Sequence, residues 1–172
     1  MLDAIDVEIK KSLKQIVQEY RSKANKEGES SKWWTKKIKD ALCQLGHNMK
    51  CVVSANRCDC ADEKEEWLFD MVWSFPIGKW NEIKLAMECE WSLDEWEIWR
   101  DFEKLLVVRS KYRVFIFTQS NDDKVKKMIN EFQIRIKNFE STVPGDRYLF
   151  AGYSPEKVGF IFQPFVATKA SI

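Results

Sequence analysis

The sequence has a single histidine, no run of apolar residues approaching membrane-spanning length, and no glycine-rich phosphate-binding motif. A transmembrane helix needs about 18 consecutive apolar residues, so we expect none. Without GxGxxG or a P-loop, we expect no nucleotide binding through a glycine-rich turn. A Ser-His-Asp or Cys-His centre would depend on His47 alone, and no nucleophile motif lies near it.

The sequence also lacks an excess of charge of either sign. Its 28 basic and 27 acidic residues give a formal net charge of +1, so nothing draws the whole chain toward nucleic acid or membrane. Residues 1–20 mix acids with bases and lack the apolar core of a signal peptide. The sequence has five cysteines and no export signal, so the simplest interpretation is that the cysteines are reduced thiols. We therefore expect a cytoplasmic protein.

Apolar residues are common enough and regular enough to predict a fold class. They make up 45% of the 172 residues, which is sufficient for one domain with a substantial core. Their spacing predicts helices over residues 1–21, 32–45, 93–108 and 121–139. Strands are predicted over residues 49–55, 66–75, 82–91, 112–120, 147–154 and 159–168, and the fourth, apolar on both faces, is typical of a central strand. This order predicts an α/β fold with a mixed central sheet flanked by helices.

The predicted helix ends depend on single residues. Gly46 follows the last apolar residue of the second helix and is expected to end it. Ser92 is expected to cap the third helix, and Asn121 or Asp122 the fourth.

Acidic residues interrupt the two most hydrophobic predicted strands. Side chains alternate along a strand, so Glu88 and Glu90 share one face of the strand over 82–91. In the preceding strand, alternation groups Asp70 with Leu68, Val72 and Ser74, and places Trp67, Phe69, Met71 and Trp73 on the other face. If the turn over 76–81 makes the strands neighbours, the three carboxylates repel one another, and Mg²⁺ or Mn²⁺ relieves the repulsion. The alternative is that these acids face solvent.

The pattern of Asp70 on one strand and Glu88-Cys89-Glu90 on the next, followed by a helix, resembles the PD-(D/E)XK nuclease superfamily. The predicted order of helix, three strands, helix and strand over residues 32–120 is similar to the restriction-endonuclease-like core. Residues 1–21 and 121–172 would be additions to it. The resemblance implies phosphodiester hydrolysis on nucleic acid, with DNA favoured over RNA. Asp70, Glu88 and the backbone carbonyl of Cys89 would bind the Mg²⁺ or Mn²⁺ ion.

The sequence departs from that superfamily at its third motif position, where the usual lysine is Glu90. Some restriction enzymes are similar in having Glu there, and in others the lysine has moved to a neighbouring element. Lys104, on the following helix, is the candidate for such a move. Glu90 or Lys104 would orient or deprotonate the attacking water. The alternative function is a catalytically inactive domain of the same fold that serves as a binding or interaction module.

Two further expectations concern the cysteines and the oligomeric state. His47, Cys51, Cys58 and Cys60 are ligand types that zinc prefers, but their spacing is not a paired CxxC pattern, and packing as small hydrophobic residues is favoured. A double-strand cut would need two active sites, which favours a homodimer. The apolar stripe from Leu2 to Tyr20 is the candidate partner surface, and its alternative role is to cover the protein's own sheet.

Overall fold

The computed structural model describes residues 4–22, 30–65, 68–75 and 82–168. Its helices are α1 (Ala4–Ser22), α2 (Ser31–Asn48), α3 (Glu95–Val107) and α4 (Asp122–Asn138). Its strands are β1 (Val52–Ser54), β2 (Met71–Ser74), β3 (Ile83–Glu90), β4 (Ser110–Thr118), β5 (Arg147–Ser154) and β6 (Gly159–Val166). No helix of this described part is long and apolar enough to cross a membrane.

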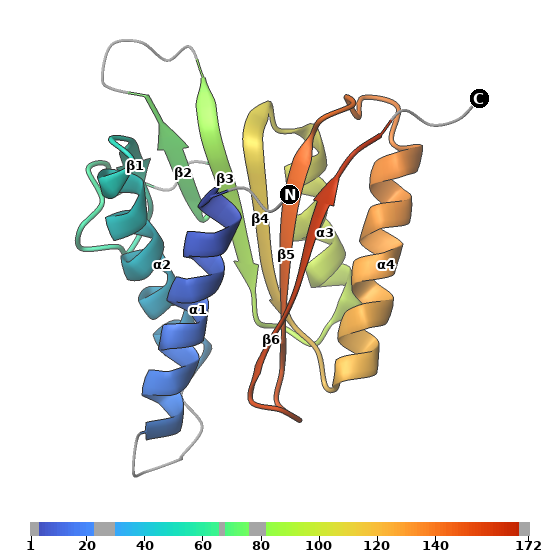
Figure 1. Ribbon diagram of the computed structural model, residues 1–172, viewed down its shortest axis with the longest axis horizontal. Coiled ribbons are helices and arrows are strands. Elements are labelled where there is room, and N and C mark those ends of the chain that lie inside the picture. The colour runs from blue at the N-terminus through green and yellow to red at the C-terminus, as the bar shows by residue number, and fades with distance from the viewer. Residues whose placement is uncertain (1–3, 23–29, 66–67, 76–81, 169–172) are drawn as a thin grey trace.

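The six strands form one mixed sheet in the order β1-β2-β3-β4-β5-β6. The pairs β1/β2, β2/β3 and β5/β6 are antiparallel, and β3/β4 and β4/β5 are parallel. The parallel pairs need crossover connections, and α3 and α4 provide them (Figure 1). The expected α/β fold with a mixed sheet is therefore confirmed, and so is the central place of β4 between two parallel neighbours.

Each face of the sheet carries its own hydrophobic core. α1 and α2 pack on one face, over residues of β2, β3, β4 and β5 that include Met71, Trp73, Met87 and Ile116. α3 and α4 pack on the other, where Phe102 of α3 and Phe132 of α4 stack with ring centroids 4.3 Å apart. Figure 1 shows both pairs of helices with the sheet between them. The two acids of β3 are thus built into the wall of a packed core.

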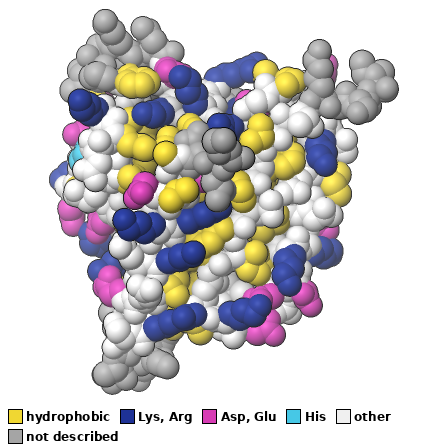
Figure 2. Space-filling view, in the orientation of Figure 1, with side chains coloured by type: hydrophobic (Ala, Val, Ile, Leu, Met, Phe, Trp, Pro, Cys, Tyr) yellow, Lys and Arg dark blue, Asp and Glu magenta, His cyan; other side chains and the backbone are white. Residues whose placement is uncertain are grey.

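The apolar stripe of α1 is used inside the molecule. Ile5, Ile9, Leu13 and Ile16 are all buried in the core on the α1 and α2 face. The stripe proposed as a partner surface therefore covers the protein's own sheet over its described length, while Leu2 lies outside the described residues. The homodimer stays a prediction. Figure 2 shows basic side chains spread over this face with acidic ones among them, as the balanced composition predicts.

The predicted alternation of side chains holds in β3 and fails just before β2. Leu85 and Met87 face α1 and α2, and Ala86 faces α3, as expected. Phe69, predicted to share a face with Met71 and Trp73, instead joins the α3 and α4 core. The reason is that β2 begins only at Met71, and residues 68–70 bend, so strand alternation does not extend to them. Trp67 and the turn over 76–81 lie outside the described residues.

Two predicted helix ends were wrong, each for a local reason. α2 continues past Gly46 to Asn48. Gly46 does not end the helix, because its role is to let the helix pass close to the sheet. A Cβ atom there would lie 2.7 Å from Cγ2 of Val53. α3 is capped by Asp94, not Ser92: Asp94 Oδ1 accepts the Trp96 N–H at 2.8 Å, and Ser92 Oγ accepts the N–H of Asp94. The expected cap at Asn121 is confirmed.

Candidate active site

The predicted site residues gather where β2 begins and β3 ends. Met71 pairs with Met87 in antiparallel register, so Asp70, one residue before β2, comes level with Glu88. Glu90 is the last residue of β3. A cavity of about 700 Å³ opens at this end of the sheet, between α2, the loop after β1 and the end of β3. Its lining includes Lys32, Lys36, Lys39, Asn56, Arg57, Asp70, Cys89, Glu90 and Trp91.

Asp70 joins three parts of the chain through its carboxylate. Its Oδ2 accepts the backbone N–H of Cys89 at 2.9 Å, which ties it to β3. Its Oδ1 lies 2.8 Å from Nζ of Lys39 on α2. The Asp70 side chain keeps 23% of its surface exposed, so one side of the carboxylate remains open to the cavity. Asp70 is therefore both anchored and accessible.

Lys39 is a cavity residue that the sequence indicated only as one member of a basic cluster with Lys36 and Lys37. Its side chain is only 6% exposed, and its Nζ also donates to the backbone carbonyl of Asn56 at 3.2 Å. A buried ammonium needs such partners, since an isolated one is very costly in an apolar environment. The available signal was its place on α2: Lys39 shares the buried face with Ile38, Leu42 and Cys43. A lysine inside an apolar stripe indicates a buried partner for its ammonium group, whereas a lysine on a solvated face does not.

Glu88 is almost fully buried on the α3 side of the sheet, with 2% of its side chain exposed. Burial raises the pKa of its carboxyl to about 9, and the nearby charge of Asp70 adds to that rise. Oε1 lies 3.3 Å from Nζ of Lys104, yet it has no hydrogen bond of good geometry within the described chain. The contact with Lys104 is therefore electrostatic. Oε1 of Glu88 stays buried without a hydrogen-bond donor of good geometry among the described residues.

Lys104, the predicted replacement for the motif lysine, does reach Glu88. Its Nζ lies 2.9 Å from Oδ1 of Asp101 and 3.3 Å from Oε1 of Glu88. Burial acts to lower the pKa of Lys104, but these two carboxylates outweigh it and raise the pKa. Lys104 thus stands between two acids on the α3 side, and it is not among the residues that line the cavity.

Glu90 and Cys89 complete the end of β3. Oε1 of Glu90 accepts the backbone N–H of Ser92 at 2.6 Å, and the residue is half-buried. Burial raises the pKa of Glu90 and the neighbouring Asp101 carboxylate raises it further, while the Ser92 bond opposes both. The Cys89 backbone is held beside Asp70 by the N–H bond described above. Both residues line the cavity.

The structure brings all the predicted residues into one region, in two groups. Asp70, Cys89 and Glu90 line the cavity, while Glu88 and Lys104 lie on the α3 side. Asp70 and Glu88 are close enough for one charge to raise the pKa of the other. Among the described residues, however, the carboxylate oxygens of Asp70, Glu88 and Glu90 are not all within 4.8 Å of one another. Lys39 pairs with Asp70, and Lys104 lies beside Glu88, which keeps its proton up to a pKa of about 9.

Basic residues gather on the α2 side of the cavity. Lys32, Lys36 and Lys39 come from the first turns of α2, and Arg57 comes from the loop after β1. Arg57 has a φ of 55°, a left-handed conformation that costs a non-glycine residue about 1 kcal/mol. Such strain is often found at functional positions, where the surrounding structure maintains it. Lys36 pairs with Asp40 and Asp59, and Lys39 pairs with Asp70, so an anionic group in the cavity would compete with these carboxylates for the two ammonium groups.

Comparison with protein-family models, curated proteins and solved structures found no match to this chain.

We predict that Glu88→Gln stabilises the metal-free protein. In the folded chain Glu88 keeps its proton up to a pKa of about 9, but the unfolded chain releases it near 4.5. The unfolded state thus binds fewer protons between these values, so wild-type stability falls as pH rises through them. The amide of the variant would not titrate. Urea unfolding should show a gain on the order of 1–3 kcal/mol at pH 8 that shrinks toward pH 5.

Glu140→Gln is the matched control, because Glu140 is an exposed glutamate outside the site. Its free energy of unfolding should stay within about 0.5 kcal/mol of wild type. A loss of stability in Glu88→Gln that is equal at both pH values would show that the buried carboxylate is not a destabilising charge.

Proposed function

We propose that this protein is a metal-dependent phosphodiesterase that cleaves nucleic acid. One observation carries the proposal: acids and cations line the same cavity at the end of β3. Cleavage of a phosphodiester needs cations that bind the anionic backbone and carboxylates that hold a metal ion or position water. The cavity offers the cations Lys32, Lys36, Lys39 and Arg57 and the carboxylates Asp70 and Glu90.

The arrangement of elements around the cavity supports the proposal. Over α2, β1, β2, β3, α3 and β4 the chain follows the order that resembles the PD-(D/E)XK core. Asp70 stands directly before the second strand of that order, and Glu88-Cys89-Glu90 ends the third. DNA is the proposed substrate in preference to RNA on the strength of the same resemblance.

Asp70 and Glu88 are the proposed ligands of a Mg²⁺ or Mn²⁺ ion, with the Cys89 carbonyl as a third. When bound, the ion would polarise the scissile phosphate and lower the pKa of a bound water. The chain has two reasons to accept a cation there. Within the described part of the chain, Oε1 of Glu88 is buried without a hydrogen bond of good geometry, and the charge of Asp70 adds to the rise in the pKa of Glu88 that burial causes. A positive charge between the two carboxylates would relieve both unfavourable interactions.

Lys39 is our candidate for the role of the missing motif lysine. It contacts Asp70 directly and lines the cavity, whereas Lys104 contacts Glu88 on the α3 side. If Asp70 turns to a metal ion, the Lys39 ammonium keeps only the Asn56 carbonyl as a partner. It can then donate to a phosphate oxygen in the cavity. Lys104 would instead hold Glu88 and Asp101 in place, and Glu90 would orient the attacking water.

A second candidate function is nucleic-acid binding without cleavage. The observation that favours it is that Lys39 and Lys104 each form an ion pair with one proposed metal ligand. The Lys39 pair neutralises Asp70 without any metal, and the residues that line the cavity include more bases than acids. In that case the chain would be an inactive member of the fold that binds phosphate groups.

We predict that Mn²⁺ binds wild-type protein and Glu140→Gln, but not Glu88→Gln, in calorimetric titration. We expect Glu88→Gln to be at least as stable as wild type, so a loss of binding in the folded variant would reflect the site and not misfolding. Wild type should cleave DNA with Mg²⁺ or Mn²⁺, and Glu88→Gln should cleave it at least about 100-fold more slowly. Equal Mn²⁺ binding by Glu88→Gln would reject Glu88 as a ligand. DNA binding by wild type without cleavage would favour the second function.

We also predict that Lys39→Met slows DNA cleavage by about 100-fold or more, because the variant loses a donor to the phosphate. Lys37→Met is the matched control: Lys37 lies on the same helix, pairs with Glu19 at 2.6 Å and does not line the cavity. Circular dichroism melting of both variants checks that each is folded. Equal cleavage rates for the two folded variants would remove Lys39 from the mechanism.

A further inference from the structure

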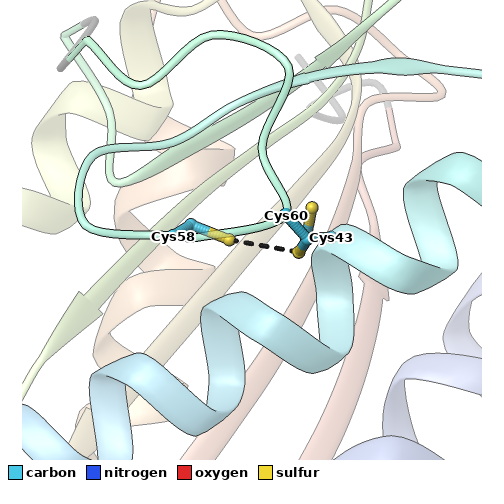
Figure 3. A group of neighbouring side chains, drawn as sticks. All are labelled: Cys43, Cys58 and Cys60. Atoms are coloured by element: carbon cyan, nitrogen blue, oxygen red, sulfur yellow. Dashed lines mark hydrogen bonds between the residues drawn. The ribbon is translucent and has the colours of Figure 1, made fainter.

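Three cysteines from two segments of the chain bring their sulfur atoms together. Cys43 lies on α2, and Cys58 and Cys60 lie on the loop after β1 (Figure 3). The Sγ atoms of Cys58 and Cys60 are 3.4 Å apart, and all three sulfur atoms lie within 4.8 Å of one another. Cys51 and Cys89 are not part of this group. Figure 3 shows the two loop cysteines directed at the helix that carries Cys43.

The spacing of the sulfur atoms suits a tetrahedral metal ion. With Zn–S bonds of about 2.3 Å, two sulfur ligands of tetrahedral zinc lie about 3.8 Å apart. The 3.4 Å separation of Cys58 and Cys60 and the 4.8 Å limit for all three bracket that value. Small rotations about the cysteine χ1 angles would therefore place the three sulfurs around one ion.

Asp40 is the candidate for a fourth ligand. Its carboxylate does not lie within 4.8 Å of all three sulfur atoms, so it would move toward the ion on binding. Asp40 lies one helical turn before Cys43, and its Oδ1 is 3.7 Å from Sγ of Cys58. In a tetrahedral site with Zn–S near 2.3 Å and Zn–O near 2.1 Å, a sulfur and an oxygen ligand lie about 3.6 Å apart. The other Asp40 oxygen, Oδ2, is 3.2 Å from Nζ of Lys36, which would fix the orientation of the carboxylate.

The three thiols lie largely inside the protein. Cys43 and Cys58 are buried, and Cys60 is half-buried. Burial raises the pKa of Cys58 to about 11, with a further rise from the Cys60 thiol. Burial raises the pKa of Cys43 as well, again helped by the other two cysteines. A soft divalent metal ion such as Zn²⁺ is the kind of ion that three cysteine sulfurs bind.

We propose that Cys43, Cys58, Cys60 and Asp40 bind one Zn²⁺ ion. Because all four tetrahedral positions would be filled by the protein, the ion would be structural and not catalytic. This site differs from the one considered on sequence spacing: it uses neither His47 nor Cys51, and it adds the helical Cys43. His47 instead lies 3.0 Å from Asp62 through Nε2.

The proposed zinc would join the loop after β1 to α2 beside the cavity. Asn56, which accepts from Lys39, and Arg57, which lines the cavity, lie directly before Cys58. Fixing Cys58 and Cys60 to α2 would hold this wall in place. The zinc proposal is independent of phosphodiesterase activity, because its ligands are not the residues proposed to bind Mg²⁺ or Mn²⁺.

Cobalt(II) titration of the fully reduced wild-type protein under anaerobic conditions tests the proposal. Co²⁺ takes the same tetrahedral site as Zn²⁺ and gives a thiolate charge-transfer band that carboxylate ligands do not give. We expect one equivalent to produce that band and one equivalent of Zn²⁺ to abolish it. Native mass spectrometry of the zinc-loaded protein should show one bound ion.

The variants place the ion at specific residues. Cys60→Ser changes the half-buried thiol, so it is the substitution least able to disturb folding, and it should weaken Co²⁺ binding at least tenfold. Cys51→Ser is the matched control and should retain the band in full. Glu88→Gln should also retain it, which separates this site from the proposed Mg²⁺ or Mn²⁺ site. Asp40→Asn should keep the thiolate band but alter the ligand-field bands.

Three results would overturn the proposal. One is the absence of a thiolate band in the reduced wild type, and another is undiminished Co²⁺ affinity in a folded Cys60→Ser protein. The third is equal loss of the band in Cys51→Ser. Circular dichroism of each variant establishes that it is folded before its Co²⁺ affinity is compared.

Discussion

The ion pair between Lys39 and Asp70 is the interaction on which the rest of this site depends. It joins α2 to the point where the chain enters β2, and the second oxygen of Asp70 continues the link to the backbone of β3. Lys39 extends it to the loop after β1 through the Asn56 carbonyl. Removal of one member of a buried ion pair commonly costs about 3–5 kcal/mol, because the other charge is left unpaired. The geometry of the cavity is therefore coupled to the packing of α2 on the sheet.

The acids at the end of β3 conflict with the stability of the core that contains them. Glu88 occupies a position on the α3 side where an apolar residue would pack well, because its neighbours on that face include Ala86 of β3 and Phe115 of β4. Burial shifts the pKa of its carboxyl strongly upward, and strongly shifted pKa values are frequent at functional sites. The same conflict raises the pKa of Glu90. A chain selected for stability alone would not place two glutamates there.

Sequence patterns were sufficient for the fold because each core depends on regular periodicity. The apolar run of β4 indicates that both of its faces are buried. The stripe of α1 and the alternating pattern of β3 indicate which side of each element faces a core. The failures arose where tertiary contacts override local pattern. Phe69 changed faces because the chain bends before β2, and α2 continues past Gly46 because the missing side chain allows close approach to Val53 and Trp73.

The candidate site was predictable only in part, for a related reason. Glu88 and Glu90 could be found because strand alternation relates them to each other, and Asp70 could be found from chain order alone, because it lies before β2 begins and its carboxylate turns to Lys39 on α2. Lys39 and Cys43 lie on a helix distant in sequence from their partners, so only the packing of α2 reveals what they contact. One local signal was present for each: both occupy the buried stripe of α2, where a lysine needs an acid and a cysteine can meet other thiols.

A crystal structure determined with Mn²⁺, with the ion located by its anomalous scattering, would test the central claim most directly. We expect a manganese ion bound by the carboxylates of Asp70 and Glu88. We also expect the Lys39 ammonium to have left Asp70 and to point into the cavity. A structure without an ion at these two carboxylates, in which Lys39 still lies 2.8 Å from Asp70, would contradict it.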